Sequence, residues 1–87
     1  ALSSLAKAHA LNGEFDLAKS YYQQALLLDI GNAELLLEMA KVFALLDDMP
    51  SALDAVNQSL RVDPSSLEAM QVKVKILLSQ TENRQLN

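Results

Sequence analysis

The stretch NAELLLEMAKVFALLDDMPSALDAVNQSLRVDP, residues 32–64, decides the fold class of this chain. It contains two segments, residues 33–46 and about 50–62, in which apolar residues recur every three or four positions. That spacing is typical of a helix that buries one face. The acidic turn at residues 47–49 separates the segments, and Pro64 ends the second because proline cannot continue a helix. The stretch therefore predicts one helical hairpin.

The apolar residues of this hairpin also follow the pattern of a known repeat family. The positions of the motif W-x2-L-G-x2-Y…A-x3-F…P are occupied, in order, by Leu36, Met39, Ala40, Phe43, Ala52, Val56 and Pro64. The hairpin thus resembles a tetratricopeptide repeat (TPR), although Leu36, Ala40 and Val56 replace the Trp, Gly and Phe of the family. The resemblance implies antiparallel helical hairpins, stacked in a right-handed superhelix, that bind partner proteins.

The pattern recurs at the family's repeat length of about 34 residues. The identical pairs at this spacing are Leu2/Leu36, Ala6/Ala40, Lys7/Lys41, Ala10/Ala44, Leu11/Leu45, Ala18/Ala52, Gln24/Gln58, Leu26/Leu60, Asp29/Asp63 and Glu34/Glu68. A second shift places Met70, Val74, Lys75 and Leu77 under Leu36, Ala40, Lys41 and Phe43. We therefore predict an all-α chain of about five helices in one domain, residues 1–80, with units 1–32 and 33–66, a closing helix 66–79, and a polar tail 81–87.

The closing helix is expected to cover the second hairpin. Ser65 and Glu68 form a predicted capping box at its start. The side toward the hairpin is predicted to hold Met70, Val74, Leu77 and Leu78. Lys73 is expected on a polar face toward solvent, as in the last helix of a repeat array. The alternative is that this helix begins a third unit whose second helix is left out. The chain starts without Met and is expected to be a fragment of a longer protein.

Composition limits the function classes. The 87 residues include no Cys and carry a formal net charge of -4, with seven Lys and Arg spread along the chain. Nucleic-acid binding is not expected, because it needs a clustered cationic face. No apolar run approaches the roughly 20 residues of a membrane span, and no signal-peptide pattern is present, so membrane insertion is not expected. The compartment stays undetermined between the slightly favoured cytoplasm and the periplasm.

Catalytic chemistry is not expected either. His9 is the only histidine and stands where the family has a core aromatic, so we expect a packed ring with one nitrogen bonded. No metal-ligand spacing, nucleophile motif or phosphate loop accompanies it, and we predict no catalytic residue, metal or cofactor. Tyr22 is expected in the core, whereas the neighbouring Tyr21 could face a partner. Met39, Met49 and Met70 are expected to fill the core.

Three lysines recur at the repeat length, Lys7, Lys41 and Lys75. In the resembled family the first helices of the units line a concave groove that holds partner peptides. The residues that the resemblance places along this groove are Lys7, Leu11, Leu37, Glu38, Lys41, Leu45, Gln71 and Lys75. The apolar residues would contact a peptide or helix, and the lysines would attract its acidic groups. The competing interpretation is an ordinary solvated face on which Glu38 pairs with Lys41.

The sequence therefore predicts a non-catalytic protein-interaction module. Two other functions stay open. One is self-association into a homo-oligomer through the exposed ends of the array. The other is a regulatory segment of a larger multidomain protein.

Overall fold

The chain is built entirely of helices in the part that the structure describes. The structure is a computed structural model that describes the backbone of residues 2–86 and the side chains of residues 2–81. Its five helices are α1 (Leu2–Leu11), α2 (Phe15–Leu28), α3 (Ala33–Leu45), α4 (Met49–Val62) and α5 (Leu67–Leu86). The predicted all-α class and the number of helices are confirmed.

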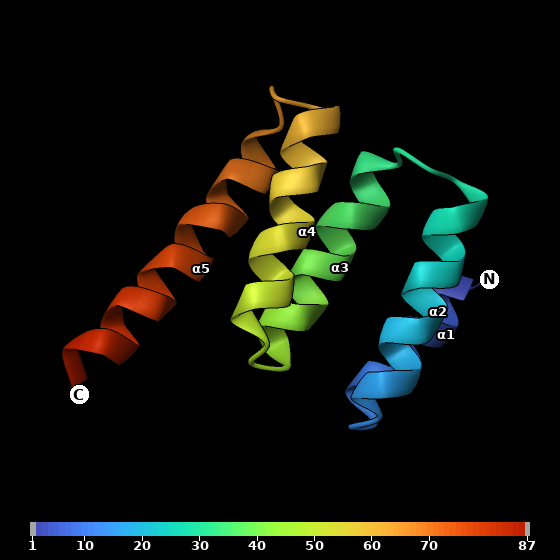
Figure 1. The fold of residues 1–87 in the computed structure, drawn as a ribbon, viewed down its shortest axis with the longest axis horizontal. Helices are drawn as coiled ribbons and strands as arrows, with labels where there is room; N and C mark the ends of the chain where they lie inside the picture. The colour runs from blue at the N-terminus through green and yellow to red at the C-terminus, as the bar shows by residue number, and fades with distance from the viewer. Residues whose placement is uncertain (1, 87) are drawn as a thin grey trace.

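The helices follow one another across a thin array. Figure 1 shows α1 and α2 at one end, α3 and α4 in the middle, and α5 at the other end. The closest pairs are α1 with α2, α3 with α4, and α4 with α5, while α3 also contacts α1, α2 and α5. The array measures 39 × 32 × 14 Å along its principal axes. It therefore consists of two antiparallel hairpins and a fifth helix packed against the second hairpin.

The helix boundaries follow from local chemistry. The Asn32 side chain accepts a hydrogen bond of 3.0 Å from the backbone N–H of Leu35 and caps α3. Asp48 caps α4 in the same way through the N–H of Ser51 at 3.3 Å. Pro50 lies in the first turn of α4, where its missing N–H costs no helical hydrogen bond.

The turns inside the two hairpins share one backbone feature. Gly13, between α1 and α2, has a φ of +83°, and Asp47, at the equivalent place between α3 and α4, has a φ of +65°. This left-handed conformation suits glycine and is tolerated by aspartate. Gly31, before α3, also has a φ of +83° and closes the connection between the hairpins.

Equivalent small and large residues form the core of both hairpins. Ala18 and Ala52 are fully buried and let the two helices of each hairpin approach closely. Tyr22 is also fully buried, and its ring meets that of Phe43 edge-on at 6.1 Å between centroids. The Phe15 ring also packs against the Phe43 ring, with 5.8 Å between the ring centroids. The aromatic cluster joins α2 to α3, and so joins the hairpins.

The side of α5 that packs against the second hairpin differs from the prediction. The buried residues are Ala69 and Ile76, with Val72 partly buried beside them. The side predicted to be buried is exposed, and it holds Met70, Val74, Leu77 and Leu78. Lys73, predicted to face solvent, is half-buried. Met39 and Met49 do pack on the core, whereas Met70 does not.

The repeat itself explains this difference. At the repeat spacing, Met70, Val74 and Leu77 correspond to Leu36, Ala40 and Phe43, which are 3%, 0% and 3% exposed. Those residues are buried because α4 lies alongside α3, and because Phe15 and Tyr22 of α2 also cover Phe43. No helix among the described residues lies alongside α5 in that way, so its three residues are 41%, 54% and 41% exposed. The buried side of α5 is instead the side by which one unit contacts the preceding one.

Both ends of α5 also differ from the prediction. Ser66, not Ser65, accepts a hydrogen bond from the N–H of Ala69 at 3.2 Å. The helix begins at Leu67, so Ser66 is the residue directly before it, whereas the N–H and hydroxyl of Ser65 both donate to Asp63, at 3.2 and 2.8 Å. The helix runs on to Leu86, through the segment predicted as the beginning of a polar tail. No Gly or Pro interrupts residues 79–86, so nothing in them ends the helix.

Candidate functional site

Two adjoining hollows run along the face formed by α1, α3 and α5. The first has a volume of about 470 Å³ and is lined by Lys7, Glu34, Leu37, Glu38, Lys41, Val42, Leu45 and Glu68. The second has a volume of about 360 Å³ and is lined by Lys41, Ala44, Leu45, Met49, Val72, Lys75, Ile76 and Ser79. Lys41 and Leu45 belong to both hollows, so together they form one continuous surface, which we call the groove.

Most of the residues predicted for a binding groove lie in these hollows. They are Lys7, Leu37, Glu38, Lys41, Leu45 and Lys75. Leu11 and Gln71 line neither hollow, although both are exposed. Leu11 is the last residue of α1, next to the turn that leads to α2. Leu37 lies in the wall of the groove and is largely buried.

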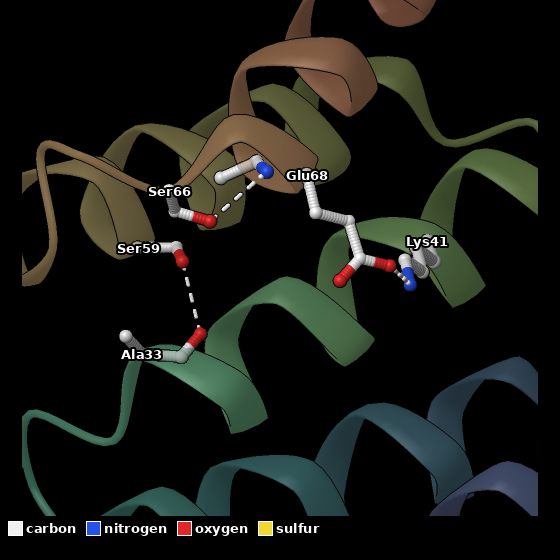
Figure 2. A network of polar contacts seen from close by, with 6 residues as sticks. Ala33, Lys41, Ser59, Ser66 and Glu68 are labelled. Carbon is white, nitrogen blue, oxygen red and sulfur yellow. Dashed lines mark hydrogen bonds and ion pairs between the residues drawn. The ribbon is translucent and has the colours of Figure 1, made fainter.

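Two acidic residues that line the groove, Glu34 and Glu68, are not among the predicted groove residues. The signal was present, because these glutamates are an identical pair at the repeat spacing, as the lysines are. Glu68 was expected to cap α5, but its carboxylate pairs with the ammonium group of Lys41. Figure 2 shows this ion pair between α3 and α5. The predicted pairing of Lys41 with Glu38 does not occur among the described ion pairs.

The ion pair joins neighbouring units across the groove. The side chains of Lys41 and Glu68 are 48% and 60% exposed, so water screens their attraction and the stabilisation is small. The equivalent pair one unit earlier, Lys7 and Glu34, lines the first hollow without forming an ion pair. Lys7 and Lys75 take part in none of the ion pairs found within residues 2–81.

A buried phenol, that of Tyr22 on α2, lies near the groove residue Glu38. The Tyr22 hydroxyl is buried and has no hydrogen-bond partner within the described residues. Its burial, together with the nearby Glu38 carboxylate, raises the pKa of Tyr22 above its ordinary value. Glu38 itself is half-buried and lines the first hollow. The groove therefore has mixed charge, with lysines at its rim and a carboxylate lower on its wall.

A second polar cluster lies at the turn of the first hairpin, outside the groove. His9 Nδ1 lies 3.1 Å from Glu14 Oε1, and the Asn12 amide donates to the same oxygen at 2.9 Å. The Asn12 hydrogen bond is the main reason that the pKa of Glu14 is lowered, and His9 adds to the effect. The His9 ring stacks on Tyr21 at 5.3 Å. His9 is thus packed with one nitrogen bonded, and Tyr21, for which the sequence left contact with a partner open, is half-buried against the His9 ring.

The comparisons with known proteins leave the groove without an assigned function. No model of a known protein family matches the sequence, and the curated proteins include no match to it. Residues 2–81 hold no cluster of three His, Cys, Asp or Glu side chains arranged for a metal ion. Among the described helices, none combines the length and apolar character needed to cross a bilayer.

Proposed function

We propose that this chain is a non-catalytic protein-interaction module that resembles a TPR scaffold and binds a partner peptide or helix in its groove. The observation that carries the proposal is the convergence of repeat-spaced residues on the groove. Lys7, Lys41 and Lys75 come from three different helices and line two hollows that share Lys41 and Leu45. Leu45 is 70% exposed, and an apolar residue of a partner would cover it.

The charges of the groove favour a partner with both apolar and acidic residues. Lys41 is already paired with Glu68, so Lys7 and Lys75 are the lysines whose charges a partner can neutralise. They lie at opposite ends of the groove, on α1 and α5. A bound peptide would therefore place acidic groups near its two ends and apolar side chains in the middle, against Leu37 and Leu45.

Selection from a random peptide library on the immobilised chain tests this proposal. We expect the selected peptides to combine acidic and apolar residues. Reversing two charges, with Lys7→Glu and Lys75→Glu together, should weaken their binding at least about tenfold, because the acidic groups then face carboxylates. Arg61→Glu on α4 is the matched control, since Arg61 is exposed and lies outside the groove. Equal affinities for the doubly reversed variant and the wild type would rule out the groove.

A second candidate function is self-association into a homo-oligomer. It is favoured by the exposed apolar side chains at the end of the array, on α5. Sedimentation velocity over a range of concentrations distinguishes the two. A monomer at all concentrations supports binding of a partner, and a concentration-dependent dimer supports self-association.

A further inference from the structure

The exposed side of α5 forms an apolar stripe that is separate from the groove. Its residues are Leu67, Met70, Val74, Leu77 and Leu78, which are between 41% and 73% exposed. They recur every three or four positions and so lie on one side of the helix. No described side chain covers them. We call this surface the α5 stripe.

The opposite end of the array has a different character. The outer side of α1 presents Ser4 and Ala8, which are exposed and offer little apolar area. They correspond, at the repeat spacing, to the residues by which α3 and α5 contact the preceding unit. The first unit therefore has small residues at these two positions, although the same helix also exposes Leu5 (47%) and Leu11 (67%). The α5 stripe contains more exposed apolar residues than α1 does.

The second hairpin shows which kind of element fits the stripe. Leu36, Ala40 and Phe43, the equivalents of the central stripe residues, are buried on α3, whose most extensive contact is with α4, and Phe43 also packs against Phe15 and Tyr22 of α2. The matching side of α4 is small, with Ala52, Ala55 and Val56 all buried. A helix with small residues at these positions can approach α5 as closely as α4 approaches α3.

A positively charged residue, Lys73, lies beside the stripe and limits which helix can bind there. Lys73 corresponds to Met39, which lines a hollow of about 330 Å³ together with Asp54 of α4. A helix seated on α5 as α4 is seated on α3 would therefore place the residue equivalent to Asp54 in the same hollow as Lys73. An acidic residue there would pair with the half-buried lysine.

We propose that the α5 stripe binds an amphipathic helix of another protein, antiparallel to α5, with small residues at the crossing and an acidic residue beside Lys73. A second copy of this chain fits less well. Two stripes packed on each other would bring two Lys73 side chains to one interface, with no acidic residue among the stripe residues to pair with them. The proposal does not depend on the groove, which lies on another side of the array.

A helix of the required chemistry exists in the chain itself and serves as the probe. A labelled peptide with the sequence of residues 47–64 contains α4 with its cap and carries Asp54. We expect saturable binding of this peptide to the complete 87-residue chain, measured by fluorescence anisotropy. Met70→Glu with Val74→Glu should reduce the affinity at least about tenfold, because burying an unpaired carboxylate is costly.

Charge reversal tests the orientation. Lys73→Glu should weaken binding at least about threefold, and a peptide with Lys in place of Asp54 should restore it. Leu27→Glu on α2 is the matched control for the stripe variants, because Leu27 is an exposed apolar residue far along the chain from α5. Lys7→Glu should leave binding of the peptide unchanged, which separates this surface from the groove. Thermal melting of each variant checks that the fold is intact.

Three results would overturn the proposal. The first is the absence of saturable binding. The second is binding that the stripe variants do not weaken, which would mean that the peptide replaces the α4 helix of the chain. The third is a dimer in sedimentation velocity that Met70→Glu with Val74→Glu dissociates, which would make a second copy the occupant.

Discussion

Ala18 and Ala52 are the residues at which the two helices of each hairpin come closest. Neither has any exposed surface. Replacing either by Leu adds atoms where no space exists, so the helices must separate or adopt strained side-chain conformations. We expect Ala18→Leu and Ala52→Leu each to lower the free energy of unfolding by roughly 1–3 kcal/mol, measured by urea denaturation.

Ala8→Leu is the matched control for this prediction, because Ala8 is a helical alanine with an exposed side chain. It should change the free energy of unfolding by less than about 0.5 kcal/mol. If all three variants unfold at the same urea concentration, the alanines are not the points of closest approach.

Glu14 links the stability of the first hairpin to pH. Hydrogen bonds from Asn12 and then His9 favour the carboxylate, so its pKa in the folded chain lies below its ordinary value of 4.5. The stabilisation is therefore complete above pH 4.5 and is lost as the pH falls through the lowered pKa. We expect Glu14→Gln to destabilise the chain at neutral pH and to have little effect well below the pKa.

Melting temperatures of the wild type and Glu14→Gln across the acidic range measure this linkage. Asp16→Asn is the matched control, because Asp16 is an exposed carboxylate in the same segment with no described ion pair. A constant difference between Glu14→Gln and the wild type at every pH would contradict the assigned hydrogen bonds.

At the scale of single elements, α5 gives a direct test of which side is buried. Ile76 is 2% exposed and Leu77 is 41% exposed, although they are neighbours of similar size. Ile76→Ala should cost about 2–5 kcal/mol, because it leaves a cavity against the second hairpin. Leu77→Ala should cost less than about 1 kcal/mol, because the removed atoms already contact water. The free energies of unfolding of the two variants measure the difference, and the reverse order would mean that α5 packs through the predicted side.

The repeat spacing predicted most of the fold but not the orientation of α5. It identified the helices because Ala18 and Ala52, or Lys7 and Lys41, recur at equivalent places in each hairpin. It failed for Met70 because burial depends on a neighbouring helix, and an apolar side chain with the right spacing stays exposed when none is present. The cap at Ser66 was missed because the helix begins at Leu67, one residue later than predicted, so that Ser66 rather than Ser65 directly precedes it.

At the scale of the whole molecule, the groove was partly predictable. The period brought Lys7, Lys41 and Lys75 to one side of the array, since equivalent positions of stacked units lie in a row. It could not predict that Lys41 pairs with Glu68, because that contact depends on the offset between α3 and α5. The pairing reduces the number of lysines available to a partner, and so changes the chemistry expected of the groove.

The arrangement of the helices also predicts an uneven stability along the chain. The central helix α3 contacts all four others, and it holds seven of the sixteen buried apolar residues in the described part of the chain, more than any other helix. In a repeat array each unit contacts only its neighbours, so the ends can open while the centre stays folded. We expect backbone amides of α3 to exchange with solvent deuterium at least about tenfold more slowly than those of α1, a difference of about 1.4 kcal/mol in opening free energy. Hydrogen exchange measured by mass spectrometry, normalised to the unfolded peptides, gives this ratio, and equal protection of all five helices would mean that the array opens only as a single cooperative unit.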